Sequence, residues 1–202
     1  DATQVDGLTN VQVAALGNNI AALVPAALAS LDAEQILGLS GEQIKALGNK
    51  IGAFSAETVA SLNPFQFSIL SADQVKSLGN NIGVLSEYCV ASLGPDRLQG
   101  LTAAQITALG DKITAVPAKD LGLLNAVQVS GLSAEQVSML QANITAISRE
   151  ALNSFTATQV DGLSGEQIGW LKYDIGFLSA SALASLDVAQ VGSLTPEQVV
   201  SL

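Results

Sequence analysis

The apolar residues of this chain fall at spacings that alternate between helix-like runs and interruptions. Between residues 32 and 62 the successive spacings are 3, 5, 3, 4, 3, 5 and 3. The residues concerned are Ile36, Leu39, Ile44, Leu47, Ile51, Phe54, Val59 and Leu62. A 3-4-3 run keeps apolar side chains on one face of a helix, and a spacing of five breaks that face. The pattern therefore predicts three amphipathic helices of about seven, fourteen and seven residues.

Each interruption holds a residue that can cap the N-terminus of a helix. Asp32, Ser40 and Ser55 occupy these places, and Gln follows three residues after the first two. This spacing is typical of a capping box, in which cap and Gln satisfy each other's free backbone N–H groups. Proline is tolerated at the start of a helix and harmful further in. All five prolines agree with the predicted starts, namely Pro25, Pro64, Pro95, Pro117 and Pro196.

The longer middle segment admits two interpretations. Its 3-4-3 spacing is uninterrupted, which favours one continuous helix. Leu-Gly-Asn at 16–18, 47–49 and 78–80 is instead typical of a helix end, because glycine readily adopts a left-handed backbone. The equivalent residues 141–143 and 172–174 lack this signal. We therefore expect a continuous helix, with two short helices joined by a kink as the alternative.

The same pattern recurs every 31 residues along the whole chain without insertion or deletion. The repeats span residues 1–31, 32–62, 63–93, 94–124, 125–155, 156–186 and, in part, 187–202. A fixed period of this length is typical of solenoids, whose repeats bury their apolar faces only against their neighbours. Helices of seven residues are not stable alone in water, so their order must come from stacking. The sequence predicts an all-α fold, an α-solenoid or superhelix with about three short helices per repeat.

We expect residues 1–202 to form a single repeat array. Solenoids usually close with atypical capping repeats. Here Asp1 opens directly on the repeat pattern, and Leu202 falls in the middle of a repeat. We therefore expect a fragment of a longer array, with the neighbouring repeats of a parent chain as its first partners.

Two residue types recur at fixed places in the repeat. Glycine stands beside a core leucine where it weakens a helix, which predicts a close contact between helices. These glycines are Gly7, Gly38, Gly100, Gly131 and Gly162. Glutamine forms two columns, for which capping is the preferred explanation. A stacked ladder of amides between repeats would add to it, and carbohydrate binding by such a ladder is the least favoured alternative.

Composition narrows the classes of function. Apolar residues make up 49% of the chain, and no apolar run is long enough to cross a membrane. The net charge of −10 argues against nucleic acid as a partner, because phosphate binding needs clustered cations. Cys89 is the only cysteine, so no disulfide forms within the chain. We expect its thiol to behave as a small, half-buried apolar group.

The sequence offers little for catalysis. Histidine is absent, which removes the commonest general base and transition-metal ligand. Nucleotide-binding and zinc-protease motifs are also missing. Acidic residues at predicted helix starts favour the helix dipole, and a calcium ladder is the less favoured interpretation. They are Glu42, Asp73, Glu135, Glu166 and Glu197. We expect no enzymatic activity, no metal and no cofactor.

Departures from the repeat pattern supply the candidate site. Trp170 stands where the repeats carry Ala or Ser at positions 15, 46, 77 and 108, and Tyr173 and Phe177 follow within two turns. These three residues would form an aromatic patch for a peptide or glycan. Drift, with larger side chains filling space between repeats, is the alternative that we favour. A second, weaker cluster consists of Phe65, Phe67 and Tyr88.

The segments LSGEQIKAL at 39–47 and LTPEQVVSL at 194–202 share one pattern, Leu-Ser/Thr-x-Glu-Gln-Ile/Val-x-x-Leu. This pattern resembles degenerate short-helix repeat tracts of very large bacterial proteins that are secreted or surface-attached and adhesin-like. The resemblance covers the entire chain and carries no catalytic residues. It implies an extracellular or cell-surface location in bacteria and a structural or adhesive role.

The leading hypothesis from the sequence is a non-enzymatic structural region, a spacer or interaction scaffold of a larger bacterial extracellular protein. The alternative is a binding module that recognises a peptide or glycan through the patch around Trp170 and Tyr173. The sequence leaves open whether the partner is a protein or a glycan.

Overall fold

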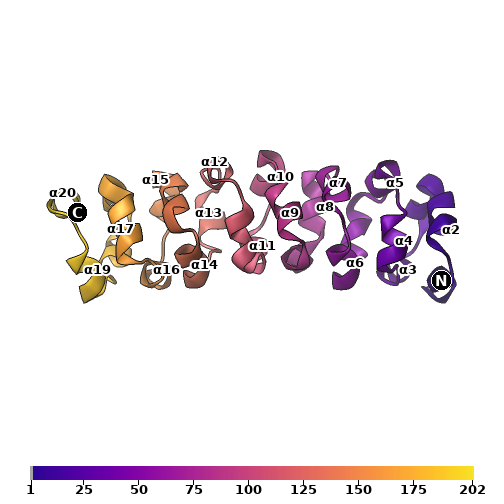
Figure 1. Ribbon diagram of the computed structural model, residues 1–202, viewed down its shortest axis with the longest axis horizontal. Helices are drawn as coiled ribbons and strands as arrows, with labels where there is room; N and C mark the ends of the chain where they lie inside the picture. The colour runs from indigo at the N-terminus through magenta and orange to yellow at the C-terminus, as the bar shows by residue number, and fades with distance from the viewer. Residues whose placement is uncertain (1) are drawn as a thin grey trace. The chain divides into compact units, whose positions relative to one another are not determined.

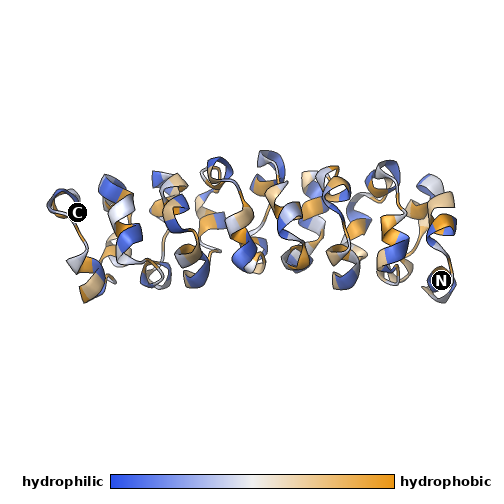
Figure 2. Cartoon of the chain, in the orientation of Figure 1, coloured by the Kyte–Doolittle hydropathy of each residue, from blue (hydrophilic) through white to orange (hydrophobic). Residues whose placement is uncertain are grey.

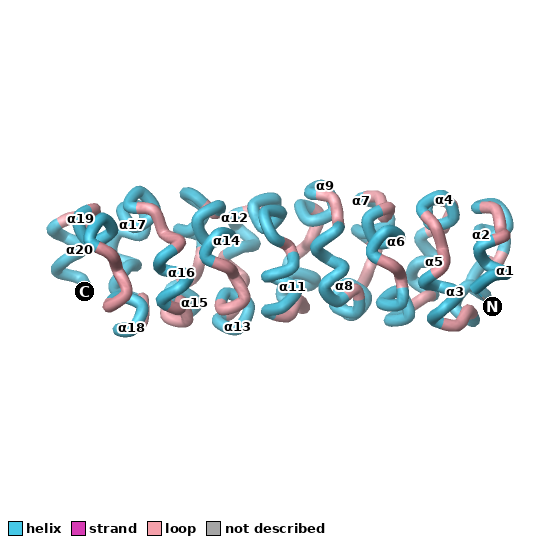
Figure 3. Tube along the Cα trace, turned by 90° about the horizontal axis from the view of Figure 1, so that it is seen from below, coloured by secondary structure: helices cyan, strands magenta, loops and turns pink. Residues whose placement is uncertain are grey.

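The computed structural model describes residues 2–202, and every regular element in that range is a short helix (Figure 1). The chain divides into two compact units, the first ending at Leu101 and the second beginning at Thr102. The all-α prediction is confirmed. Figure 3 shows the short helices and the brief loops that join them.

The described part of unit 1 contains ten α-helices and three 3₁₀ helices. They are α1 (Ala2–Asp6), α2 (Asn10–Ala15), η1 (Gly17–Ala22), α3 (Pro25–Ala29), α4 (Ala33–Leu37), α5 (Gly41–Ala46), η2 (Gly48–Ala53), α6 (Ala56–Ala60), α7 (Pro64–Ser68), α8 (Ala72–Ser77), η3 (Gly79–Val84), α9 (Glu87–Ala91) and α10 (Pro95–Gln99). The order of two α-helices, a 3₁₀ helix and an α-helix recurs throughout, so the architecture of short helices is repeat-like.

Unit 2 has the same inventory of ten α-helices and three 3₁₀ helices. They are α11 (Ala103–Ala108), η4 (Gly110–Ala115), α12 (Ala118–Leu121), α13 (Ala126–Val129), α14 (Ala134–Met139), η5 (Gln141–Ala146), α15 (Arg149–Leu152), α16 (Ala157–Asp161), α17 (Gly165–Leu171), η6 (Lys172–Phe177), α18 (Ala180–Leu183), α19 (Val188–Gly192) and α20 (Pro196–Ser201).

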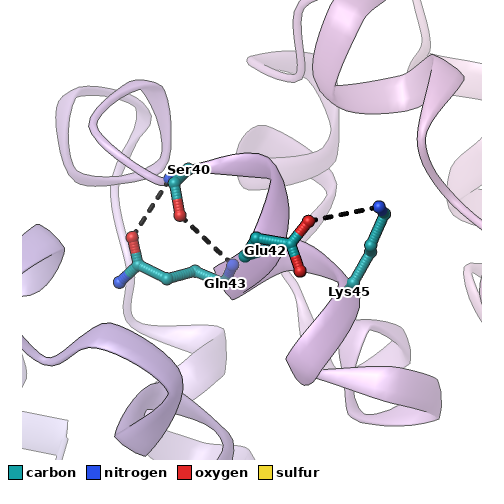
Figure 4. Close-up of polar contacts among 4 residues, drawn as sticks. All are labelled: Ser40, Glu42, Gln43 and Lys45. Carbon is teal, nitrogen blue, oxygen red and sulfur yellow. Dashed lines mark hydrogen bonds and ion pairs between the residues drawn. The ribbon is translucent and has the colours of Figure 1, made fainter.

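The predicted caps begin these helices. At α5 the Ser40 hydroxyl accepts a hydrogen bond from the backbone N–H of Gln43 at 3.3 Å (Figure 4). Gln43 Oε1 accepts one in return from the backbone N–H of Ser40 at 3.1 Å. Pro25, Pro64, Pro95 and Pro196 occupy the first helical position, and Pro117 is itself a cap residue. The capping boxes and the placement of all five prolines are confirmed.

The predicted apolar positions form the core. All eight apolar residues of the pattern between residues 32 and 62 are at most 5% exposed, and Ile44 and Ile51 are fully buried. Figure 2 shows apolar and polar residues side by side on the short helices, as expected where each helix buries one face. Since the helices have only four to seven residues, this burial rather than intrinsic helix stability must hold them.

The expectation of a continuous middle helix is wrong. A six-residue α-helix, α5, ends at Ala46, and a separate 3₁₀ helix, η2, begins at Gly48. Gly48 has a φ of +50°, and the backbone N–H of Lys50 closes the turn by donating to the Leu47 carbonyl at 3.1 Å. The chain therefore has four short helices, not three, in each full pattern. The apolar spacing did not reveal the break because Leu47 and Ile51, on either side of it, both still face the core.

Two such turns lack glycine. Positive φ occurs at Gly17, Gly48, Gly79 and Gly110, and also at Gln141, with 49°, and Lys172, with 50°. A side chain on such a backbone is strained by about 1–3 kcal/mol. Replacing Gln141 with glycine is therefore expected to raise the free energy of unfolding of unit 2 by about 1 kcal/mol, as measured by urea denaturation.

Gly110→Ala is the matched control for that variant, because no atom lies within 4 Å of a Cβ built at Gly110. Only the backbone conformation is then perturbed, and we expect a loss of about 1–2 kcal/mol. A Gln141→Gly protein that is less stable than the parent would contradict the assignment of strain to this turn.

Close contacts between helices explain part of the glycine column. A Cβ on Gly131 would lie 2.3 Å from the Ala103 carbonyl oxygen, and one on Gly162 would lie 2.2 Å from that of Ala134. The predicted close approach is confirmed at these two positions. It is looser at Gly38 and Gly100, where the nearest atoms are 3.2 Å and 3.3 Å away. Gly7 has only carbonyls of its own turn within 4 Å.

The residue that packs against each position of the glycine column is small where the column residue is large. Where the column holds Ile69, the facing residue is Gly41, and a Cβ there would lie 2.9 Å from Ile69 Cδ1. Where it holds Ser193, the facing residue is Gly165, with a separation of 3.0 Å from Ser193 Cβ. The facing pairs are Asn10–Gly38, Gly41–Ile69, Ala72–Gly100, Ala103–Gly131, Ala134–Gly162 and Gly165–Ser193. Each pair contains at least one glycine.

Candidate functional site

Buried glutamines connect segments that lie about one sequence repeat apart. In unit 1, Gln35 Oε1 accepts from the backbone N–H of its cap residue Asp32 at 3.0 Å. Its Nε2 donates to the carbonyls of Val5 at 2.9 Å and Leu8 at 2.7 Å, 30 and 27 residues earlier. The side chain is 2% exposed. One amide thus completes a cap and also binds carbonyls at the end of a preceding helix, which lack partners within that helix.

The second glutamine column bonds to the turn described above. In unit 2, Gln136 Oε1 accepts from the backbone N–H of Ser133 at 2.9 Å. Its Nε2 donates at 2.9 Å to the carbonyl oxygens of Ile106 and Gly110, the latter being the residue with positive φ. Gln74 makes the corresponding bonds to Ile44 and Gly48 in unit 1.

These contacts correct one interpretation of the glutamine columns. Where the structure gives the contacts of a buried Nε2, as at Gln35, Gln74 and Gln159, the amide donates to backbone carbonyls and not to another glutamine. The prediction of capping is confirmed. The buried members are at most 5% exposed and so offer no amide surface to a carbohydrate. They are Gln35, Gln43, Gln66, Gln74, Gln105, Gln128, Gln136, Gln159, Gln167, Gln190 and Gln198.

Arg97 replaces glutamine once in the first column. Its Nη1 donates to the carbonyls of Ser68 and Leu70, and its Nη2 donates to that of Ser92 at 2.6 Å. Burial lowers the pKa of the guanidinium, although the charge of nearby Asp96 opposes this shift. Nε is buried without a hydrogen-bond partner. The arginine therefore keeps the bonds to the preceding segment but leaves one donor unsatisfied.

The weaker aromatic cluster is not a surface patch. Phe67 is fully buried and lies 5.9 Å, ring centroid to guanidinium carbon, from Arg97. Phe65 and Tyr88 are 68% and 78% exposed. The structure thus separates Phe67, a core residue, from the other two.

The three predicted site residues lie at the surface of unit 2. Trp170, near the end of α17, is 36% exposed, while Tyr173 and Phe177, both in η6, are 62% and 41% exposed. Trp170 and Tyr173 line an open groove of about 550 Å³. Phe177 does not line it. Its ring instead supports Arg149, whose guanidinium carbon lies 4.7 Å from the ring centroid.

Charged and polar residues complete this groove, which we call the Trp170 groove. Its lining consists of Ala142, Thr145, Arg149, Gly169, Trp170, Leu171, Lys172, Tyr173 and Asp174. Arg149 Nε donates to Asp174 Oδ1 at 2.8 Å, across from α15 to η6. Tyr173, Lys172 and Gly169 also border a smaller hollow of about 200 Å³ with Thr195, Glu197 and Gln198. Tyr173 therefore stands on the rim between two depressions.

Sequence reasoning missed Arg149 and Asp174. A signal was present in both, since other repeats carry Pro, Ala or Glu at the position of Arg149 and Asn or Lys at that of Asp174. Both are charged departures from the repeat pattern, whereas the predicted patch consists of aromatic departures. The two residues lie 25 positions apart in the sequence, a separation that the apolar pattern does not indicate.

Cys89 is more buried than expected. The residue is fully inaccessible, and Sγ lies 3.4 Å from the Leu62 carbonyl oxygen as a weak donor. Burial raises the pKa of the thiol, with bonds to Ser86 opposing the shift. Thr58, at the same place in its repeat, donates from its hydroxyl to the Leu31 carbonyl. Cys89 thus fills a structural place and is not a half-buried thiol.

Two kinds of site bear on metal and membrane binding by residues 2–202, a cluster of metal ligands and a membrane-spanning helix. Within this range no three His, Cys, Asp or Glu side chains come together as a metal site. None of the helices described there has the length and apolar character needed to cross a bilayer. No protein-family model and no curated protein matches the sequence.

Proposed function

We propose that this chain is a non-enzymatic structural array, an α-solenoid of 31-residue repeats that serves as a spacer or interaction scaffold. The observation that carries the proposal is the bonding of the buried glutamines to carbonyls 26 to 30 residues earlier. In a stack of equivalent layers each layer contacts only its neighbours, so contacts between layers recur at a constant sequence distance, as these bonds do.

The two units support this proposal independently. Gln74 in unit 1 and Gln136 in unit 2 bond to equivalent residues, one of them a glycine with positive φ in each case. The recurring side chains are thereby used for capping and packing. This leaves the exposed faces of the repeats free to vary, as a spacer or scaffold permits.

The setting of the array follows from the resemblance of its repeat. Motifs such as LSGEQIKAL at 39–47 are similar to those of large bacterial secreted or surface-attached proteins. We therefore propose an extracellular or cell-surface location in bacteria, as part of a longer adhesin-like chain. The net charge of −10 suits a solvated surface of this kind.

Deletion of one repeat tests the stacked array. Removal of residues 63–93 joins Leu62 to Gly94 and keeps the repeat register. We expect helix content per residue, measured by circular dichroism, to be retained. The maximum dimension from small-angle X-ray scattering should shorten by about 10 Å, one layer of helices.

Removal of residues 63–78 is the control, since it takes out α7, α8 and half a repeat and destroys the register. This variant should lose cooperative unfolding. If the full-repeat deletion unfolds the chain while the half-repeat deletion does not, the proposed array is wrong.

The Trp170 groove favours a second candidate function, a binding module for a peptide or glycan. Exposed aromatic rings beside charged groups are typical of recognition surfaces and not of a spacer. Here Trp170 and Tyr173 would contact the ligand, and Arg149 would hold Asp174 in place from the neighbouring helix.

A further inference from the structure

We propose that the Trp170 groove binds a neutral saccharide. This inference rests on the second candidate function above and specifies its ligand. The volume of the Trp170 groove, about 550 Å³, falls within the range of roughly 300–1,000 Å³ that small-molecule sites occupy. A site of this size holds a few sugar rings.

The aromatic rings supply one half of the recognition. Trp170 and Tyr173 line the groove from α17 and η6 and remain 36% and 62% exposed. Flat exposed rings offer a large apolar area at a low cost in conformational entropy. The C–H face of a pyranose ring is flat and apolar, so it packs against such a surface.

The ion pair supplies the other half. Arg149 and Asp174 are joined through Nε and Oδ1, and their side chains are 63% and 36% exposed. This bond leaves the Nη hydrogens and a carboxylate oxygen for a ligand. The guanidinium also lies over the ring of Phe177. A planar donor group beside an acceptor matches neighbouring hydroxyls, each of which both donates and accepts.

Charge selects a neutral ligand over a charged one. An anion would meet Asp174, and a cation would meet Arg149 and Lys172. A polyol bonds to both signs without repulsion from either. Two common modes of peptide binding, strand addition to a sheet and an apolar helix in an apolar groove, do not fit this groove. Residues 2–202 contain no strand, and this groove has a charged wall.

Strained backbone conformations also occur beside the Trp170 groove. The two non-glycine residues with positive φ in the described chain are Gln141 and Lys172. Lys172 lines the groove, and Gln141 immediately precedes Ala142, which lines it as well. Strain of this kind costs about 1–3 kcal/mol and persists chiefly at functional sites. Both flanks of the groove thus carry a cost in stability that plain structural turns avoid with glycine.

The protein reports directly on this site, because Trp170 is its only tryptophan. We would screen an array of neutral, anionic and cationic saccharides together with proline-rich and acidic peptides. The strongest neutral hit, with cellotetraose as the first probe in solution, would be titrated against tryptophan fluorescence. We expect a saturable change for at least one neutral saccharide.

Variants then locate the binding. Tyr173→Ala and Asp174→Ala should each weaken it by about tenfold in calorimetry. Phe65→Ala removes an equally exposed ring in unit 1 and should leave affinity unchanged. Circular dichroism verifies that each variant is folded.

The outcomes separate the two proposals. If a peptide binds, its binding is lost in Tyr173→Ala and no neutral saccharide binds, the proposal of a binding module stands and the proposal of a saccharide ligand is wrong. Preference for a charged saccharide would overturn the neutral class. Absence of any hit, or hits that survive both groove variants, would overturn the saccharide and the binding module together.

Discussion

Replacing Gln136 with alanine is expected to lower the free energy of unfolding of unit 2 by about 3–4 kcal/mol. The substitution removes the partner of the Ser133 N–H and of two carbonyls, those of Ile106 and Gly110. A buried polar group without a partner costs about 1–3 kcal/mol, and water would compensate for part of this loss. Urea denaturation followed by circular dichroism measures the change.

Gln12 provides the matched control. It occupies the same place in the first repeat and completes a capping box with Thr9, but it is exposed. Gln12→Ala should therefore cost only about 1 kcal/mol, as expected for a lost cap. Equal losses for the two variants would show that capping alone accounts for the columns and that the bonds to earlier carbonyls add nothing.

Changing Gln136 to glutamate replaces the Nε2 donor with an oxygen and so tests the contribution of that donor alone. The shape is kept, but a carboxylate would face the carbonyls of Ile106 and Gly110. Burial beside acceptors raises the folded-state pKa of the new carboxyl above its unfolded value. The folded state then holds a proton that the unfolded state releases, so this variant should lose stability as pH rises from about 4 to 7. The parent chain serves as the reference at each pH.

The second large effect is expected at Gly162. Gly162→Ser would place a Cβ 2.2 Å from the Ala134 carbonyl oxygen and 2.7 Å from its carbon. Because both atoms belong to the backbone, the helices α14 and α16 must move apart. We expect a loss of about 2–3 kcal/mol, typical of an overpacked interior, in the same denaturation experiment.

Ala134→Gly should restore part of that stability. The double variant recreates the pair Gly165–Ser193, which this chain already uses in the same unit. A double-mutant cycle is expected to give a favourable coupling of about 1 kcal/mol. Gly192→Ala, an exposed helical glycine with no atom within 4 Å of its Cβ, should instead stabilise the unit by roughly 0.5–1 kcal/mol. Strict additivity of the two changes at the pair would contradict the matching of facing residues.

The helix starts could be predicted from the sequence because capping and proline geometry depend only on residues that are close together in the chain. The capping box at Ser40 and Gln43 depends on residues three apart, and a proline such as Pro64 marks a helix start by its own geometry. The break at Gly48 was harder to predict. The apolar spacing favoured a continuous helix, whereas the glycine indicated a helix end. The 3₁₀ helix agrees with both, because it starts at the glycine and still keeps Ile51 in the core.

Features between repeats were predicted only in part. The burial of Gln136 could be expected from its position beside core residues, but the target of its Nε2 depends on how the layers are offset. The matching of Gly41 to Ile69 likewise becomes visible only when the facing positions are known. At the candidate site, Trp170 and Tyr173 stood out by size, whereas Arg149 required the same knowledge of which residues face each other.

The glutamine bonds also have a direction. Within each unit the described Nε2 donors belong to the later segment and the carbonyl acceptors to the earlier one, as in Gln35 to Val5 and Gln190 to Val160. A ribosome releases the acceptors first and the matching donors about 30 residues later. In the proposed array, each newly made segment would therefore bring donors to carbonyls that have already left the ribosome, and the layers would order one after another during translation.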